Sequence, residues 1–411
     1  MKSREGKDLS FFYLYMLFFV FLVFQLTKIK SIWRIETIGT TVSAVSFFIM
    51  SYVAIRTITN RHFHKNIWIY YILPGVCIVA GMMANITWNV LGDLRSISFY
   101  GMMFPWIAYL AILFWCTQGE YPLEKMWKIY YLFMIVTTGL AIIDYWLTFY
   151  VGNHIRYIMA SNGPYAVSLL ALYHYLEDGS LYYRMYGVFR EPGSLGMFII
   201  PTLLYAWQYR KYIGFSVLLI GLYLSGSLGA NIAFFMVAVF FFCYKFIKKR
   251  SLFTLLLIIT LVSVIVLFFL PYLESAYQQK ALSAEVRELA VYNTFKYFPQ
   301  LAVKYIFGAR IDETQNILEL GFAPIYFLLI GGVLAMLGFM LCLGVSVTIA
   351  VWDFFCFSNS SKIEQVVLIS IFPMLTFIMQ RETIWSTGLF VFLFAPVIYY
   401  RLAGHQRSKL D

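Results

Sequence analysis

Long apolar runs, separated by short polar stretches, recur along the whole of this 411-residue chain. A transmembrane helix needs about 20 apolar residues to cross the hydrocarbon core of a bilayer. The segments that fit this requirement are 9 to 27, 37 to 55, 67 to 86, 97 to 117, 129 to 150, 192 to 209, 212 to 225, 228 to 244, 251 to 271, 321 to 350, 363 to 380 and 384 to 400. Because no linker or internal repeat divides the chain, the pattern predicts one all-α integral membrane domain over residues 1 to 411, with about 12 transmembrane helices.

Some of these segments have features of their own. Basic residues precede the first segment as in a signal peptide, yet no small-residue cleavage site follows it, so we predict a retained first helix. The segments 212 to 225 and 228 to 244 are short, and Ser225-Gly226-Ser227 must turn the chain between them. The segment 321 to 350 is long enough that we predict a tilt, or a bend at Gly331-Gly332.

Composition excludes a soluble globule, since 61% of the residues are hydrophobic and only 12% are charged. Soluble domains carry roughly a quarter of charged residues. The five cysteines lie in apolar segments or in a segment predicted to be inside, and they form neither a CxxC motif nor a disulfide framework. His62 and His64 have no cysteine or acid close by. We therefore expect no metal site and no cofactor.

The net charge of +11 would suggest a nucleic-acid partner in a soluble protein, but here the placement of the charges matters more. With the N-terminus inside, 18 of the 31 Lys and Arg residues lie in inner segments, and only 5 lie in short outer ones. This bias predicts that both termini of the multi-pass chain are cytoplasmic, and the membrane context argues against a nucleic-acid partner.

Two connections are much longer than the others, and both are predicted to be extracytoplasmic: 151 to 191, with 41 residues, and 272 to 320, with 49 residues. Long outer loops usually carry function. In the first loop, the apolar stretch Ala166 to Tyr175 is too short to span and is interpreted as a re-entrant or interfacial helix. In the second loop, Leu282, Val286, Leu289 and Ala290 recur at helical spacing and predict an amphipathic surface helix.

Candidate chemistry begins at the end of the first loop, where the sequence from Tyr186 to Gly196 runs into the segment 192 to 209. Pro192 suits a first helical turn, and Glu191 can cap its free amides, so a helix start explains much of this motif. Alternatively, the helix N-terminus together with Arg190 and Arg184 forms an anion site suited to a diphosphate. Asp144, the only acid inside a predicted span, is interpreted as a partner for an outer-loop side chain or as a substrate contact.

The second loop ends in a similar way, because Arg310 and Gly321 bracket ten residues before the next span. An arginine at a membrane border often contacts lipid phosphate. With one such residue in each loop, the two cations could instead converge on one ligand.

The layout and these two segments resemble the Wzy-type O-antigen and capsule repeat-unit polymerases, within the O-antigen polymerase and ligase superfamily. The local markers are the segment Phe189 to Gly193 and the pattern of Arg, ten residues and Gly from Arg310 to Gly321. The counterpart in the first loop, Arg184 to Gly196, has eleven intervening residues. The turn at Ser225-Gly226-Ser227 is similar to a small-residue turn that commonly carries Arg after the Ser, where this chain has Leu228. Another basic residue, such as Arg287 or Arg381, would have to replace this phosphate contact.

The resemblance implies a metal-independent glycosyltransferase with a GT-C-type fold. Such an enzyme lies in the bacterial inner membrane and joins undecaprenyl-diphosphate-linked oligosaccharide repeat units on the outer face of that membrane. The lipid diphosphate is the leaving group, and the product is O-antigen or capsule. Its partners would include membrane lipid and a chain-length regulator protein. The implied catalytic residues are Arg190, Arg310 and Glu191, with Glu191 activating the acceptor hydroxyl and Asp312 and Glu313 behind it; the implied substrate-binding residues are Arg184, Arg287, Asn316 and Arg381.

Three other functions remain open. The sister O-antigen ligases carry a functional histidine in their large outer loop, and the loop 272 to 320 has none, which favours a polymerase. A flippase for lipid-linked oligosaccharides would show two related halves, short loops and charged residues inside the bundle, unlike this chain on the last two counts. A structural membrane scaffold would leave the arginines of the outer loops unexplained.

Overall fold

The computed structural model describes most of the helical segments and parts of the loops. The described residues are 2–25, 36–89, 97–151, 156–160, 163–167, 172–175, 181–182, 184–189, 192–247, 292, 296–309, 323–356, 361–375 and 388–407. The helices are α1 (Lys2–Val20), η1 (Phe21–Gln25), α3 (Glu36–Asn60), α4 (Lys65–Ile67), η2 (Trp68–Ile72), α5 (Leu73–Asn89), α6 (Ile97–Ala111), α7 (Leu113–Thr117), α8 (Leu123–Val151), α9 (Pro192–Gln208), α10 (Tyr212–Ser225), α11 (Leu228–Ile247), α15 (Ala323–Cys356), α16 (Lys362–Met374), η7 (Phe390–Phe394) and α17 (Ala395–Arg407). Where the structure describes them, the predicted spans fall almost entirely on helical residues; the span 251 to 271 and the ends of four others (26–27, 321–322, 376–380 and 384–387) lie outside the described residues.

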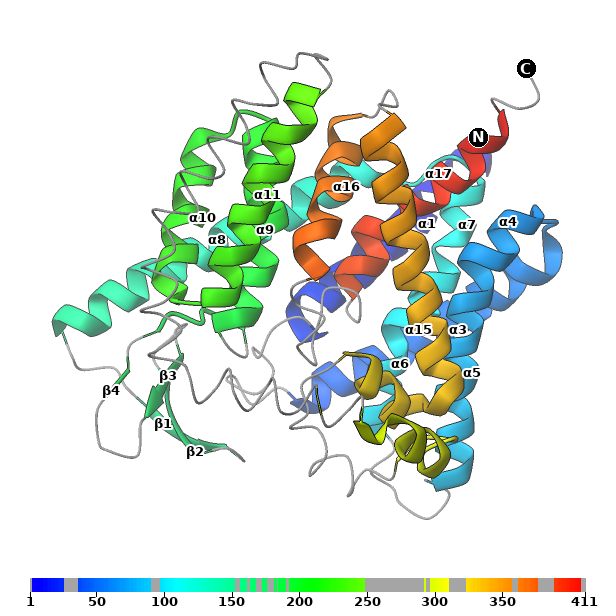
Figure 1. Ribbon diagram of the computed structural model, residues 1–411, viewed down its shortest axis with the longest axis horizontal. Coiled ribbons are helices and arrows are strands. Elements are labelled where there is room, and N and C mark those ends of the chain that lie inside the picture. Colours follow the sequence, from blue (N-terminus) through cyan, green and yellow to red (C-terminus); the bar gives the residue numbers. More distant parts are fainter. Residues whose placement is uncertain are drawn as a thin grey trace.

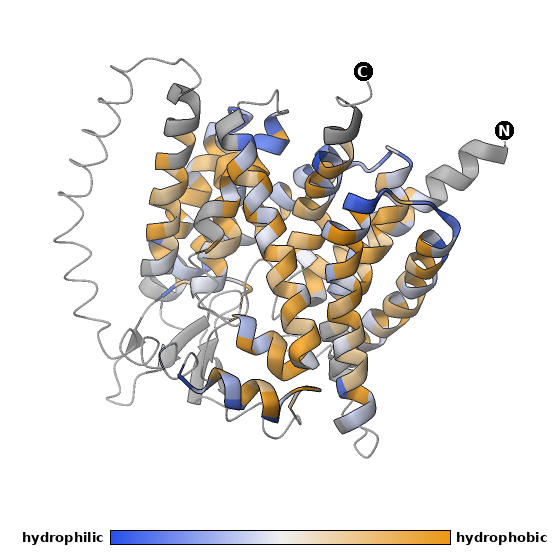
Figure 2. Ribbon diagram, turned by 45° about the vertical axis from the view of Figure 1, so that its right-hand side comes forward, coloured by the Kyte–Doolittle hydropathy of each residue, from blue (hydrophilic) through white to orange (hydrophobic). Residues whose placement is uncertain are grey.

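Four of the described helical stretches are long and apolar enough to cross a membrane: Thr41–Asn60, Lys65–Trp88, Leu123–Thr148 and Ala323–Asp353. Large apolar side chains such as Phe48, Leu140 and Leu337 are exposed on their outer faces. Figure 2 shows the apolar colouring continuing over the outside of the bundle. Such surfaces suit contact with lipid, where a helix satisfies its own backbone polar groups. The protein is therefore a predominantly helical membrane protein, as predicted.

The helices form two groups that lie side by side (Figure 1). In one group, α8, α9, α10 and α11 pack against one another, and in the other, α5 packs against both α15 and α6, and α6 against α3. The two groups are joined by α16, which contacts α9, α11 and α15, and by η7, which contacts α6 and α8. Bundle packing of this kind buries an aromatic-rich core, in which Trp106, Trp127 and Tyr109 are among the largest fully buried side chains.

A small antiparallel sheet lies at the end of the bundle opposite to α4 and the end of α17 (Figure 1). Its strands β1 (Arg156–Ala160), β2 (Gly163–Val167), β3 (Leu172–Tyr175) and β4 (Leu181–Tyr182) are paired in sequence order. The predicted helix from Ala166 to Tyr175 is therefore wrong. Short runs rich in tyrosine and β-branched residues favour strands, and a ten-residue segment is too short to sustain a helix by itself. The predicted helix from Leu282 to Ala290 lies outside the described residues.

Ionic contacts at the α4 and α17 end tie three helices together. Arg401 Nη2 of α17 lies 3.3 Å from Asp353 Oδ1 of α15 and 3.2 Å from Glu364 Oε2 of α16. Glu364 also accepts a 2.7 Å hydrogen bond from the Ser361 amide, and Ser361 Oγ accepts one of 3.3 Å from the Glu364 amide. This reciprocal pair is a capping box, which defines where α16 begins.

The long helix α15 is broken at Gly331 and Gly332, as the sequence predicts. Gly332 has φ 69° and ψ −170°, a backbone conformation that side chains with a Cβ rarely adopt. The break interrupts the helical ladder inside an apolar bundle, so the released backbone groups need other partners. Two of these partners come from residues 306–309, within the predicted loop 272 to 320: the Ala309 amide donates to Leu329 O (2.7 Å), and the Val333 amide donates to Ile306 O (3.1 Å).

The fully buried side chain of Asn85 on α5 satisfies more of this backbone. Its Nδ2 amide donates to Ile330 O (3.0 Å), Leu329 O (3.2 Å) and Ala309 O (3.4 Å). Gly81, one turn earlier on α5, allows the broken part of α15 to lie directly against α5, since a Cβ added at Gly81 would overlap Gly331 O. We call Asn85, Gly81, Gly331, Gly332 and residues 306–309 the glycine–amide joint.

We expect Asn85→Ala to lower the free energy of unfolding by about 1–3 kcal/mol, because three buried carbonyl oxygens lose a shared donor. Thr87→Ala is a matched control on the same helix, since Thr87 is exposed and bonds only Met83 O and Ala84 O of its own helix. Thermal unfolding of the purified protein in detergent measures both. Equal melting temperatures of the Asn85→Ala variant and the wild type would show that the Asn85 amide does not stabilise the glycine–amide joint.

Candidate functional site

The structure describes the segments next to the predicted site residues, but only one of those site residues themselves. Arg184 lies within the described residues. The other predicted site residues lie outside them: Arg190, Glu191, Arg287, Arg310, Asn316 and Arg381, together with Asp312 and Glu313. The fold does hold the segments directly next to them: residues 184–189, the start of α9, and residues 305–309.

Residues 184–189, which precede Arg190, are fixed against three helices. The Met185 amide donates to Leu224 O of α10 (3.1 Å), and the Phe189 amide donates back to Tyr186 O (3.2 Å). Gly187 has φ 57° and lies against Ala141 of α8. The ring of Phe189 stacks on Phe198 of α9, with 5.3 Å between centroids. The chain therefore enters Arg190 and Glu191 from a buried, well-packed turn.

Arg184 reaches from this segment to the turn between α10 and α11. Its Nε donates to Ser225 O (3.2 Å) and its Nη2 to Gly226 O (2.9 Å). Gly226 adopts the left-handed conformation that ends α10 (φ 55°, ψ 25°), so these carbonyls belong to the negative end of that helix. At least two of the five guanidinium N–H donors thus hold the turn together. A substrate contact by Arg184 stays a prediction.

This placement changes the interpretation of the small-residue turn. The sequence has Leu228 where an arginine was expected, yet the fold brings the guanidinium of Arg184 to the same turn from 41 residues upstream. Contacts across this separation cannot be read from local spacing. The predicted substitutes for the missing arginine, Arg287 and Arg381, lie outside the described residues.

Two helices begin beside Arg184. α9 starts at Pro192, as predicted, and α11 starts at Leu228, where Ser227 Oγ accepts a 3.4 Å hydrogen bond from the Ala230 amide. Their first turns touch, since a Cβ added at Gly196 would overlap the Cβ of Ala230. Helix N-termini carry free amides and a partial positive charge. These two ends supply partial positive charge that favours an anion, while the guanidinium of Arg184 bonds the carbonyl end of α10 in the turn before α11.

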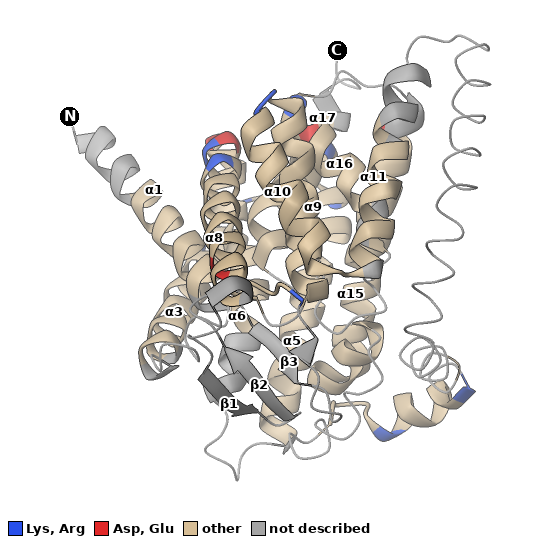
Figure 3. Ribbon diagram, turned by 90° about the vertical axis from the view of Figure 1, so that its left-hand side faces the viewer, with Lys and Arg blue, Asp and Glu red and all other residues tan. Residues whose placement is uncertain are grey.

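An acidic group lies on the helix that faces this region. Asp144 belongs to the buried stripe of α8 that includes Thr138, Ala141 and Thr148. Ala141 contacts Gly187, and Thr138 lies against Gly221 of α10, so the stripe faces the segment that leads to Arg190. The position is consistent with both interpretations of Asp144, as a partner of an outer-loop side chain and as a substrate contact. In Figure 3, charged residues of α8 lie near its two ends.

The second loop is held at the same end of the bundle through the glycine–amide joint. Gly308 (φ 93°) lies so close to Asn85 that an added Cβ would overlap its amide, and Ala309 is buried directly before Arg310. A helix of residues 296–304 precedes the joint and lies at the bottom of Figure 1. Asn85 was not among the predicted site residues. The available signal was an amide within an apolar span, four residues after Gly81.

We expect Gly196→Ala to lower the free energy of unfolding by roughly 1–3 kcal/mol, because the new methyl group forces the first turns of α9 and α11 apart. Gly229→Ala is the matched control one residue before Ala230, since no described atom lies within 4 Å of a Cβ added there. The control should be neutral or stabilising by up to about 1 kcal/mol, as alanine favours a helix. Chemical or thermal unfolding in detergent compares them; similar stability of both variants would refute the close approach.

Comparison of the chain with models of known protein families and with curated protein sequences gives no match. The assignment of function therefore rests on the geometry above, on the chemistry of the loop residues, and on the resemblance of the layout and of the segments near Arg190 and Arg310.

Proposed function

We propose that this protein is a polymerase that joins undecaprenyl-diphosphate-linked oligosaccharide repeat units into O-antigen or capsular polysaccharide. The observation that carries the proposal is the convergence of Arg184 with the N-termini of α9 and α11 at the end of the bundle where both long loops are anchored. A lipid diphosphate lies at the headgroup plane, so a protein that acts on it needs positive charge at that depth. Helix N-termini and arginines supply such charge without a metal ion.

In the proposed reaction, the acceptor hydroxyl oxygen bonds to the anomeric carbon of a lipid-linked glycan while the bond from that carbon to the diphosphate oxygen breaks. The hydroxyl proton passes to a carboxylate, for which Glu191 is the proposed base, with Asp312 and Glu313 near it in sequence. The electron pair of the broken bond leaves with the lipid diphosphate. Arg190 and Arg310 stabilise that charge, which is the largest electrostatic change in the reaction.

The segments directly before Arg190 and before Arg310 are firmly attached to helices, which supports this proposal. Residues 185–189 are packed on α8, α9 and α10, and residues 306–309 are bonded to α15. Catalytic groups must be held within a fraction of an ångström to be effective, so a rigid attachment directly before Arg190 and before Arg310 supports their roles. Arg184 would hold the turn before α11 and add positive charge, with Arg287, Asn316 and Arg381 as further proposed substrate contacts.

The proposed architecture has about 12 transmembrane helices, a GT-C-type fold, both termini in the cytoplasm, and the loops 151 to 191 and 272 to 320 outside. Substrate lipid, the surrounding bilayer and a chain-length regulator are the proposed partners. A flippase is the second candidate. Among the described residues, the buried carboxylates are Asp144 and Asp353, and both lie near helix ends. A path for a charged headgroup through the bundle would favour polar groups at mid-depth, so the polymerase is preferred.

The orientation predicts opposite labelling of two exposed lysines in a background without native cysteines. Lys304→Cys, on the helix of residues 296–304, should react with a membrane-impermeant maleimide in spheroplasts, whereas Lys65→Cys at the start of α4 should react only after permeabilisation. The helical bundle separates the two positions, so they report on opposite faces (Figure 1). The reverse pattern would invert the protein and exclude polymerisation at the outer face.

Activity is tested with purified protein, lipid-diphosphate-linked repeat units, chelator and no nucleotide sugar. We expect a ladder of longer glycans. Arg190→Ala and Arg310→Ala should each lower the rate roughly ten- to hundredfold, because each removes a charge-assisted contact of about 1.5–3 kcal/mol. Lys296→Ala is the control, because it also removes a cation from the predicted loop 272 to 320. Lys296 lies over the rings of Tyr292 and Tyr297 and has no role in the proposed reaction.

A test in cells separates the polymerase from the flippase. Loss of a polymerase should leave single repeat units that still reach the surface acceptor, whereas loss of a flippase should leave these units on the inner leaflet. A preparation that moves labelled units between vesicle leaflets and forms no ladder would refute the polymerase and support the flippase. Normal chain length from either arginine variant would remove that residue from the mechanism.

A further inference from the structure

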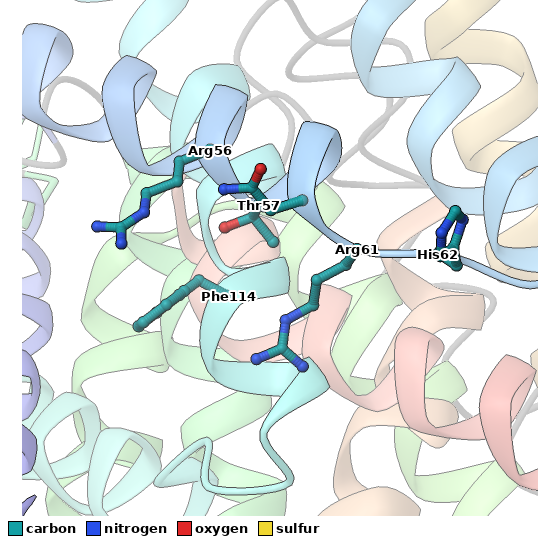
Figure 4. A pocket seen from close by; sticks show the side chains of 6 residues that line it. Arg56, Thr57, Arg61, His62 and Phe114 are labelled. Atoms are coloured by element: carbon teal, nitrogen blue, oxygen red, sulfur yellow. The ribbon is translucent and has the colours of Figure 1, made fainter.

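A basic cavity of about 670 Å³ lies where α3 ends. In Figure 1 the following helix, α4, lies at the end of the bundle opposite to the sheet. It is lined by the last turn of α3, the residues that follow it, and one aromatic residue of α7: Arg56, Thr57, Asn60, Arg61, His62 and Phe114. Figure 4 shows the ring of Phe114 between the guanidinium groups of Arg56 and Arg61, with His62 pointing away from them. The proposed reaction uses none of these residues.

The lining is cationic and contains no carboxylate. Within the described part of the chain, the ion pairs are those of Arg401, and neither Arg56 nor Arg61 takes part in them. Both arginines are exposed, and Asn60 beside them can donate a further hydrogen bond. Guanidinium groups match the geometry of phosphate oxygens, which they bind through two parallel hydrogen bonds. The chemistry of the cavity therefore selects a phosphate-bearing anion.

The surface below the cavity is apolar. Phe48, Tyr52 and Arg56 follow one another at intervals of four residues, so they share one face of α3. Phe48 and Tyr52 are each 64% exposed, and Ile55 beside them is 63% exposed. This stripe belongs to the stretch Thr41–Asn60 that is long and apolar enough to cross a membrane. A ligand in the cavity thus has two guanidinium groups at one end and a lipid-facing helix surface at the other.

We infer that this cavity binds an anionic phospholipid, with the phosphate between Arg56 and Arg61 and an acyl chain along Phe48 and Tyr52. A basic residue at the border of a transmembrane helix commonly meets lipid headgroups in general. This site differs because two arginines, a donor amide and an aromatic ring line one cavity, and one of these arginines, Arg56, shares a face of α3 with the exposed Phe48 and Tyr52. A free phosphate compound would use the guanidinium groups but not the stripe, so the lipid is the better fit.

The test measures lipid binding to the full-length protein purified in detergent. Native mass spectrometry counts retained lipids after addition of dioleoylphosphatidylglycerol or dioleoylphosphatidylcholine, and a thermal shift measures stabilisation by each. We expect the wild type to retain phosphatidylglycerol in preference to phosphatidylcholine, and R56Q/R61Q to bind phosphatidylglycerol at least fivefold more weakly. The matched control is K125Q/K128Q, which removes two exposed cations from α8, a helix that packs against α9, α10 and η7.

The single variants R56Q and R61Q repeat the test with a smaller change of charge, so a double variant that fails to fold does not end it. Their phosphatidylglycerol binding should fall between that of the wild type and the double variant. Unchanged binding in both single variants would overturn the inference, as would equal retention of phosphatidylcholine by the wild type. Inorganic phosphate at millimolar concentration should not reproduce the thermal shift; if it does, the site binds free phosphate and the lipid assignment is wrong.

Discussion

The fold depends on the need to satisfy backbone polar groups inside an apolar bundle. At Gly331 and Gly332 the helical ladder of α15 is interrupted. The Nδ2 amide of Asn85 donates to the carbonyl oxygens of Leu329 and Ile330, which directly precede the break, and to that of Ala309 in the segment packed beside it. In an apolar bundle, backbone groups at a helix break must be satisfied by the protein itself. The Asn85 side chain and the amides of Ala309 and Val333 meet this need, so the break in α15 depends on them. Gly81 and Gly308 are required because any side chain there would prevent the approach.

This joint links stability to the proposed chemistry. The residues that satisfy the break in α15 are also the last described residues before Arg310, so the same hydrogen bonds that allow a bent helix also fix the start of a loop segment. The first loop is held in a comparable way, by Met185 on Leu224 and by Arg184 on the turn before α11. In both cases the described residues next to a predicted loop are attached by hydrogen bonds to the backbone of a neighbouring helix or turn.

The two ends of the bundle use positive charge differently. Near Arg184, the charge comes from helix N-termini and from a guanidinium that is held in place by its bonds to the carbonyl oxygens of Ser225 and Gly226. Near Arg56 and Arg61, the guanidinium groups are exposed around an open cavity next to a lipid-facing surface. At a third place, Arg401 is paired with Asp353 and Glu364 and serves the packing of α15, α16 and α17.

The sequence by itself determined that the protein is a helical membrane protein, where most helices lie, that α9 begins at Pro192, and that α15 breaks at Gly331-Gly332. These features follow from apolar length, proline and glycine, which act locally. Only the tertiary structure decided that Arg184 bonds the turn at Ser225 and Gly226, that Asn85 donates to the carbonyls at the break in α15, and that residues 163–167 and 172–175 form strands. Each of these depends on a partner elsewhere in the fold: a strand needs a neighbouring strand to pair with, and a side-chain donor finds its acceptor only when another segment is packed against it.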